Sequence, residues 1–344
     1  MSENAQAEQF DFTLLVCTYN RAADLREALR TALAQETGGR FGFEVVVVDN
    51  NSTDDTRAVV EGFAAAGHTN LRYIFEGRQG KSYALNTGLA AARGRLYTIV
   101  DDDFVLPPDW LAKIFEGFQA HPDVSFVSGK VLPLWQAEPP DWLTQEHWSA
   151  VAVTDYGEEE FFADESKQVC LLACTFKLED VRAVGGYDGQ LGVSAGKIGG
   201  VEDLDILRRL WAAGRRGLYL PGVWFQHKVA PSRLTKAYHR RWHKGHGRSY
   251  ALMRDAEVER ASARLFDVPS YMYRQAAASA VGWLWHTARG RGARAFECEA
   301  RLHFIAGFFR QRRADHLAAG GRGTLGELVS FARALVSGKL LRRT

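Results

Sequence analysis

Three consecutive carboxylates, Asp101, Asp102 and Asp103, directly follow the apolar run LYTIV. Neighbouring negative charges repel one another, so such a turn is costly unless a cation lies beside it. A divalent ion held by oxygen ligands together with a diphosphate is the usual solution. An acidic turn in contact with water is the alternative, and it is disfavoured if a sheet carries this turn at a binding edge.

Two earlier apolar runs also end in polar residues. Asp49 follows FEVVVV and either accepts hydrogen bonds from a nucleobase or ribose, or caps the next helix. In the loop Thr18, Tyr19, Asn20 and Arg21, the tyrosine ring can stack on a base and the arginine can pair with phosphate; a plain polar loop is the alternative. No GxGxxG or GxxxxGK(S/T) pattern occurs, which argues against a dinucleotide or P-loop site.

Three further positions carry residue types that suit the same chemistry. Lys81 precedes a helix pattern, where it either neutralises a diphosphate or is an ordinary surface lysine. Glu202 and Asp203 follow two glycines and open a helix, so they are either capping residues or contain the general base for an attacking hydroxyl. His227 ends a late strand and is either structural or a third metal ligand.

Strand-forming runs and helix patterns follow one another along the chain and predict the elements that position these residues. Strand-forming runs occupy residues 12–17, 43–48, 71–75 and 96–100, and helix patterns separate them. This order predicts a parallel sheet with right-handed crossovers and helices on both faces. Because ligands bind outside the carboxyl ends of such strands, we expect the polar tips to meet in one crevice.

The remainder of the chain has weaker patterns. A helix is expected after Asp109, and a helical, basic and aromatic region beyond Ser232. Further strands are expected at residues 124–132, 169–176, 217–220 and 223–226, with irregular chain over 133–168.

Charge and composition restrict partners and compartment. Residues 1–230 contain 21 basic and 33 acidic side chains, and residues 231–344 contain 22 and 8, so the first part suits metal and the second anionic lipid or a phosphorylated acceptor. No run reaches the ~20 apolar residues of a membrane span, and the acidic first residues do not resemble a signal peptide. Four cysteines without metal spacing suit a reducing compartment. We therefore expect a cytoplasmic location.

In combination, the motifs resemble family 2 glycosyltransferases of the Asp-x-Asp, nucleotide-sugar type over about residues 12–250. The matching segments are LLVCTYNR, VVVVDNNSTDDT, GKSYALNTGLAAARGRLYTIVDDDF, VGGYDGQLG, GGVEDLDILRRL and FQHKV. The resemblance implies an α/β fold of the GT-A type, with a Rossmann-like, mostly parallel sheet flanked by helices and a C-terminal helical region. It places a catalytic domain at residues 1–230, with a nucleotide-binding half at about 10–105 and an acceptor half at about 106–230, before a helical region at 231–344.

The resemblance also implies roles for matching residues. Asp49, the loop 18–21 and Lys81 would bind the nucleotide sugar, and Asp102 would contact ribose or phosphate. The metal and diphosphate would be held by Asp101 and Asp103 with His227. Asp203 would be the catalytic base and Glu202 its support or an acceptor contact. The implied cofactor is a divalent metal, Mn²⁺ or Mg²⁺.

The resemblance further implies a reaction and its partners. A sugar would pass with inversion from a nucleotide-diphosphate donor to a glycan or lipid-linked acceptor, in the making of cell-surface polysaccharide. The Gln-x-x-Arg-Trp signature of processive synthases is replaced here by Tyr238-His239-Arg240-Arg241-Trp242, which favours transfer of a single sugar.

Other functions remain to be weighed at this point. A nucleotidyltransferase would normally have a triphosphate loop after the first strand, which CTYNR is not, and a non-catalytic sugar-nucleotide-binding subunit would be expected to lack some of the acidic residues. The basic C-terminal region either contacts an anionic membrane at the inner face, packs on the catalytic domain, or does both. Nucleic acid is not expected as a partner, because no recognition motif occurs.

Overall fold

The computed structural model describes residues 10–194, 196–261, 263–321 and 326. The described part of the chain divides into two compact units. The first unit comprises Met1–Glu138, Val151–Ala195 and Glu202–Pro231, and the second comprises Pro139–Ala150, Gly196–Val201 and Ser232–Thr344. Predictions for residues 1–9 and for most of 322–344 lie outside the described residues.

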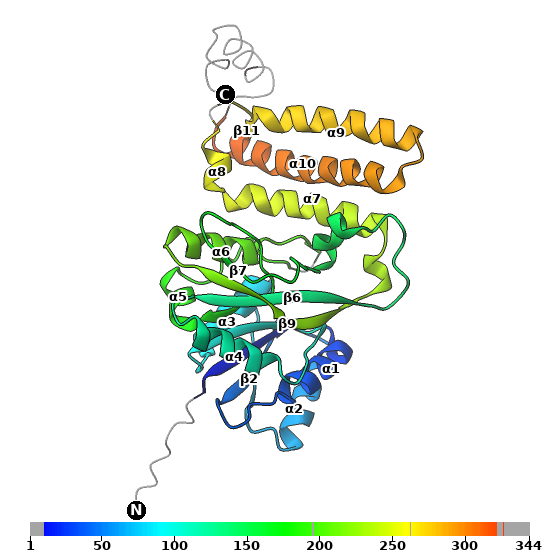
Figure 1. Cartoon of the computed structure of the whole chain (residues 1–344). Coiled ribbons are helices and arrows are strands. Elements are labelled where there is room, and N and C mark those ends of the chain that lie inside the picture. Colours follow the sequence, from blue (N-terminus) through cyan, green and yellow to red (C-terminus); the bar gives the residue numbers. More distant parts are fainter. Residues whose placement is uncertain (1–9, 195, 262, 322–325, 327–344) are drawn as a thin grey trace, which may run out of the picture. The chain divides into compact units, whose positions relative to one another are not determined.

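The first unit is built on a mixed sheet whose first half is parallel, as the alternating patterns predict (Figure 1). Its parallel strands are β1 (Phe12–Thr18), β2 (Phe43–Asp49), β3 (Leu71–Phe75) and β4 (Leu96–Asp101), in the order β3-β2-β1-β4. The register sets Thr18 opposite Asp49 and Cys17 opposite Asp101. The carboxyl ends of β1, β2 and β4 therefore finish at the same level of the sheet.

The second half of the sheet differs in part from the prediction. Its strands are β8 (Thr175–Lys177), β6 (Phe126–Trp135), β9 (Gly217–Val229), β5 (Phe104–Val105) and β7 (Phe161–Ala163). The expected strand at 169–176 is reduced to β8, and the two short strands expected after Gly217 are one continuous strand. The interval 133–168 is not wholly irregular, since β6 extends into it and β7 lies within it.

Successive apolar side chains along each strand point to opposite faces of the sheet, and they form one hydrophobic cluster on each face. Leu14 and Val16 of β1 pack with helices α1, α2 and α4 on one face. Leu15 between them packs with α3, α5 and α6 on the other face. This two-sided burial explains why the strands are continuously apolar. The helices are α1 (Ala22–Leu33), α2 (Thr56–Ala65), α3 (Lys81–Ala91), α4 (Trp110–Ala120), α5 (Leu178–Ala183) and α6 (Glu202–Ala212), with 3-10 turns η1 (Gln145–Val151) and η2 (Pro231–Arg233).

The second unit is mostly helical. It contains α7 (Lys236–Met253), α8 (Ala256–Glu259), β10 (Arg264–Leu265), β11 (Val268–Pro269), α9 (Ser270–Ala288) and α10 (Gly292–Ala318). Helix α10 packs against both α7 and α9 (Figure 1). Glycines allow α7 and α10 to approach closely: a Cβ on Gly307 would lie 1.9 Å from the Lys244 carbonyl oxygen, and one on Gly247 would lie 2.0 Å from that of Phe304.

A cluster of aromatic rings that includes two histidines lies within the second unit. The Trp142 ring lies edge-on to His239 and Phe296, with centroids 4.9 and 4.6 Å apart, and His147 lies 5.2 Å from Phe296. Burial, together with the neighbouring His147, lowers the pKa of His239 to about 4, so the ring is neutral at physiological pH. None of the helices in the described ranges is both long and apolar enough to cross a membrane.

Candidate active site

The acidic turn after β4 is held by the loop after β1. Arg21 Nη1 lies 2.6 Å from Asp102 Oδ1 and 2.9 Å from Asp103 Oδ2, and the Thr18 hydroxyl donates to Asp102 Oδ2 over 2.8 Å. We expected Arg21 to meet phosphate, but here its guanidinium pairs with these carboxylates. This internal cation offsets the repulsion within the turn.

Strand pairing brings His227 to the same turn. Phe104 of β5 lies opposite His227 of β9, and His227 Nε2 is 3.1 Å from Asp103 Oδ2. Both side chains are almost fully buried. The sequence suggested a connection between these residues, more than a hundred positions apart, and the antiparallel pairing of β5 with β9 provides it.

Burial makes the acidic turn electrostatically unusual. It raises the pKa of Asp102 to about 7, with Arg21 opposing the rise and Asp103 adding to it. The same carboxylates outweigh the effect of burial on Arg21 and raise the pKa of its guanidinium. A proton or a cation is therefore readily accommodated here near neutral pH.

A second acidic group forms around Lys81. Its Nζ lies 3.0 Å from Asp101 Oδ1 and 3.7 Å from Glu202 Oε1. Burial lowers the pKa of Lys81, but Asp101, Asp203 and Glu202 outweigh this and raise it well above its ordinary value. The end of β4 and the start of α6, a hundred residues apart, thus meet at one buried ammonium group.

The Glu202–Asp203 pair is held uncharged more readily than ordinary carboxylates. Burial raises the pKa of Glu202 to about 7, and Asp203 adds to the rise while Lys81 opposes it. Burial also raises the pKa of Asp203, with Lys81 opposing and Asp101 adding. A base with a raised pKa accepts a proton more strongly, which suits removal of a proton from a hydroxyl.

Asn50, which belongs with Asp49 to the polar tip after β2, and Glu76, which the sequence analysis missed, hold the chain that leads to Lys81. Asn50 Oδ1 accepts the Gly80 N–H over 2.7 Å, and its amide donates to the Arg78 carbonyl over 2.7 Å. Glu76 accepts from the Thr87 hydroxyl over 2.5 Å, and Gly80 has a φ of +143° that favours glycine. Glu76 could have been found from its position, because it follows β3 directly, just as polar residues follow β1 and β2.

A second missed residue, Asn86, holds the start of the glycine-rich segment at Tyr187. Its side chain both donates to the Tyr187 carbonyl over 2.7 Å and accepts the Tyr187 N–H over 2.8 Å. Nearby, a Cβ on Gly192 would lie 2.4 Å from the Ser82 hydroxyl, so only glycine fits against α3 there. Tyr187 and Gly192 are thus held against the helix that begins with Lys81.

Asp49 and the rest of the loop after β1 lie beside these groups without direct contact to the acidic turn. Asp49 accepts hydrogen bonds from the Tyr73 hydroxyl and the Ser52 N–H, each over 2.8 Å. Asn20 accepts the Thr53 N–H over 2.7 Å, and Tyr19 is 38% exposed. The exposed ring remains available for stacking, whereas Asp49 is committed to structural hydrogen bonds.

The residues expected to hold metal are divided between the two groups. Asp103 and His227 are in contact, while Asp101 points to Lys81. No three or more His, Cys, Asp or Glu side chains gather into a ready metal cluster within the described ranges. The donor types nevertheless fit Mn²⁺ or Mg²⁺, because two carboxylates and an imidazole suit such ions and the Asp101 side chain is 31% exposed.

Two family models match the part of the chain that carries this site. Residues 13–151 match the model of Glycosyl transferase family 2. Residues 97–290, more than half of the chain, match the model of Glycosyl transferase family group 2. The chain is a family 2 glycosyltransferase. Its acidic turn lies within both matched ranges, and the Glu202–Asp203 pair lies within the second.

Two curated relatives resemble this glycosyltransferase over most of its length. Glucosyl-dolichyl phosphate glucuronosyltransferase of Haloferax volcanii is 26% identical over 63% of this chain and 69% of that protein. Succinoglycan biosynthesis protein ExoM of Rhizobium meliloti is 28% identical over 69% of this chain and 74% of that protein.

A solved structure shares the fold of this glycosyltransferase. The mannosyltransferase PcManGT from Pyrobaculum calidifontis, in complex with GDP-Man and Mn²⁺, superposes with a TM-score of 0.59 over 89% of this chain and 88% of that chain, at 24% identity. The expected GT-A fold, with its mostly parallel sheet and C-terminal helices, is confirmed.

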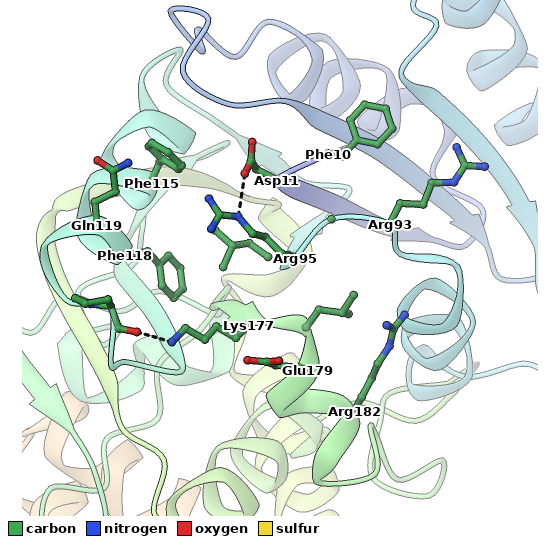
Figure 2. A pocket seen from close by; sticks show the side chains of 14 residues that line it. Phe10, Asp11, Arg93, Arg95, Phe115, Phe118, Gln119, Lys177, Glu179 and Arg182 are labelled. Carbon is green, nitrogen blue, oxygen red and sulfur yellow. Dashed lines mark hydrogen bonds and ion pairs between the residues drawn. The ribbon is translucent and has the colours of Figure 1, made fainter. Parts of the chain in front are cut away.

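A cavity of about 1130 Å³ lies at the opposite edge of the sheet, away from the acidic turn. Figure 2 shows basic side chains around it, but several already have partners: Arg95 bonds Asp11 over 2.9 Å and Lys177 bonds the Pro122 carbonyl over 2.6 Å. It adjoins the amino ends of β1 and β4, where Phe12 and Leu96 begin the strands. We therefore do not assign this cavity to the glycosyltransferase reaction.

Proposed function

We propose that this enzyme transfers one sugar from a nucleotide-diphosphate donor to a hydroxyl group, with inversion at the anomeric carbon and with the help of a divalent metal. The observation that carries the proposal is the meeting of the acidic turn with the Glu202–Asp203 pair at Lys81, at the carboxyl edge of the sheet. In this arrangement the proposed leaving-group site and the proposed proton acceptor would lie side by side.

The donor would occupy the edge formed by the ends of β1, β2 and β4. Tyr19, with Asn20 and Thr18 beside it, is our candidate for the nucleoside face because its ring is exposed. Lys81 would pair with a diphosphate oxygen, because its ammonium group already lies beside the Asp101 carboxylate at this edge. Asp102 remains our candidate for the ribose contact, and Asp49 would support nucleoside binding indirectly, through the loop that it anchors.

Asp101, Asp103 and His227 are the residues that would hold the metal, which would neutralise charge on the departing diphosphate. Arg21 presently pairs with Asp103, so its guanidinium is placed to remain near the diphosphate as a further positive charge.

Asp203 is our candidate for the base. Its carboxylate would take the proton of the acceptor hydroxyl while that oxygen bonds to the anomeric carbon and the bond to the diphosphate breaks. Glu202, the more buried of the two, would support Asp203 through the shared contact with Lys81. Bond formation and loss of the leaving group occur at opposite faces of the sugar, which gives inversion.

The relatives suggest the kind of acceptor. One is named for succinoglycan biosynthesis and another for transfer to a glucosyl-dolichyl phosphate. We accordingly propose a glycan or lipid-linked acceptor in cell-surface polysaccharide synthesis, with residues 1–230 as the catalytic part. Since the family is that of glycosyltransferases, we no longer favour a nucleotidyltransferase or a non-catalytic subunit.

We also propose a cytoplasmic location. All four cysteines are free thiols in the structure: Cys174 is buried, and Cys17, Cys170 and Cys298 are partly buried. Free thiols are typical of reducing compartments.

The test is release of nucleoside diphosphate from a panel of UDP-, GDP- and dTDP-sugars, with Mn²⁺, with Mg²⁺ and with chelator, and with glycan acceptors. We expect one nucleotide class to be used, with metal-dependent turnover and a product of inverted anomeric configuration by NMR. Metal-independent turnover, or a product of retained configuration, would contradict the mechanism.

A further inference from the structure

The outward face of helix α9 lacks the charges that a water-facing helix surface normally carries. No Asp, Glu, Lys or Arg occurs from Gln275 to Ala288. Within this segment Val281 is 67% exposed, Leu284 is 61% exposed and Trp285 is 53% exposed. Scattered exposed apolar residues are ordinary, but three within five positions of one helix form a continuous apolar surface.

The other face of α9 is the one that packs within its own unit. Met272 and Ser279 are buried, and a Cβ on Gly282 would lie 2.9 Å from Cys298 Sγ of α10. These positions recur at helical spacing, and α10 runs beside α9 (Figure 1). The residues Val281, Leu284 and Trp285 fall on the side away from this contact, so α10 does not cover them.

Positive charge flanks the apolar surface at both ends. Arg274 precedes it, Arg289 and Arg291 follow it, and no acidic residue occurs between Asp267 and Glu297. The Arg289 guanidinium lies 3.7 Å from the centroid of the Trp285 ring. An apolar centre with arginines on both sides complements a layer of lipid chains beneath anionic phosphate groups.

We propose that the surface of Val281, Leu284 and Trp285, here called the α9 apolar face, lies in the headgroup region of an anionic bilayer. The helix would lie in the membrane plane, because its uncharged segment is too short to span a bilayer. Trp285 would sit at the boundary between lipid chains and water, where tryptophan is favoured. Arg274, Arg289 and Arg291 would pair with lipid phosphates.

This surface is independent of the proposed sugar transfer, and its test needs no donor or acceptor. The full-length protein is mixed with vesicles of phosphatidylcholine alone or of phosphatidylcholine with phosphatidylglycerol, and the bound fraction is measured by sedimentation at low and high salt. We expect at least about tenfold stronger binding to the anionic vesicles at low salt, and a clear loss at high salt.

Two sets of substitutions separate the apolar and charged contributions. Leu284→Gln with Trp285→Gln is expected to weaken binding at least about tenfold, and Arg289→Gln with Arg291→Gln to remove most of the preference for anionic vesicles. Leu317→Gln is the matched control, since Leu317 is 42% exposed but lies on α10, and it is expected to bind like the parent. Far-ultraviolet circular dichroism and thermal unfolding confirm that each variant folds.

The proposal is overturned if the parent does not bind anionic vesicles, or if the α9 variants bind as the parent does. It is also overturned if sedimentation without vesicles shows a parental dimer that Leu284→Gln with Trp285→Gln converts to a monomer, because a second copy would then cover the α9 apolar face. A parent protein that binds vesicles but transfers no sugar would count against the proposed reaction alone.

Discussion

Replacing the two acidic residues at the start of α6 one at a time would identify the base. Glu202 is 4% exposed and lies 3.7 Å from Lys81, whereas Asp203 is only partly buried and so is better placed to reach an acceptor. Asp203→Asn removes the proposed proton acceptor while keeping nearly the same shape. Glu202→Gln replaces a carboxyl that is already about half protonated at neutral pH, because burial raises its pKa to about 7.

These differences predict unequal losses. Removing a general base costs roughly 10²- to 10⁴-fold in kcat, or about 3 to 5 kcal/mol in activation free energy. We expect a loss in this range for Asp203→Asn with the donor KM within about threefold, since the base contributes to the transition state and not to donor binding. For Glu202→Gln we expect a loss below about tenfold.

The pH dependence of the parent enzyme gives a second measure. Burial raises the pKa of Asp203, with Lys81 opposing this and Asp101 adding to it, and a base is active only when deprotonated. The value of kcat/KM should therefore rise with pH through a pKa above the ordinary 3.8 of an aspartate, and this rise should disappear in Asp203→Asn.

The assay is steady-state release of nucleoside diphosphate at saturating acceptor. Asp205→Asn is the matched control, because Asp205 lies in the same helical turn but pairs with Arg209 over 2.6 Å. Its kcat should stay within about threefold of the parent, because Asp205 contacts Arg209 and takes no part in the proposed proton transfer. The reasoning would be refuted if Asp203→Asn kept more than about a tenth of the parental kcat, or if Asp205→Asn lost as much.

Three other outcomes are expected. Chelation should abolish turnover, and Mn²⁺ or Mg²⁺ should restore it within minutes; turnover that survives dialysis against chelator would contradict the metal requirement. Gly307→Ala should lower the midpoint of thermal unfolding, because the new Cβ would lie 1.9 Å from the Lys244 carbonyl oxygen. Overpacking costs about 1–3 kcal/mol, which exceeds the gain in helix propensity of about 1 kcal/mol. An unchanged midpoint would show that the helices separate freely. Burial lowers the pKa of His239, His243 and His246 to about 4, 3 and 4. The folded state therefore binds fewer protons than the unfolded state below pH 6.5, and the free energy of unfolding should fall by a few kcal/mol in total as pH drops from 6.5 to about 4. A denaturant midpoint that is constant over this range would refute this.

The first half of the fold was predictable because local pattern and burial agree there. Four apolar runs became β1 to β4, and the polar residue after each of β1, β2 and β4 came to lie at one edge. The second half was less predictable. Thr175 is fully buried between β4 and β6, but only three residues of its apolar run pair as strand β8, since neighbouring strands and not local composition decide where pairing stops.

Within the site, the sequence indicated which residues would gather but not how their charges would be arranged. Arg21 was expected to await phosphate, yet in the protein alone it pairs with Asp102 and Asp103. The contact between Lys81 and Glu202 joins two segments about 120 residues apart, which no local pattern reports. Asn86 was missed for the same reason, because its partner Tyr187 lies in a distant segment.

Arg21 and Lys81 give the acidic edge its own counter-ions, so the folded chain does not rely on a supply of divalent ions to keep its carboxylates together. If turnover requires a divalent ion as proposed, a cell short of manganese or magnesium would retain folded enzyme and lose only its turnover. Recovery would then require arrival of the ion and not synthesis of new protein, so the rate of sugar transfer would follow ion availability within the lifetime of a single protein molecule.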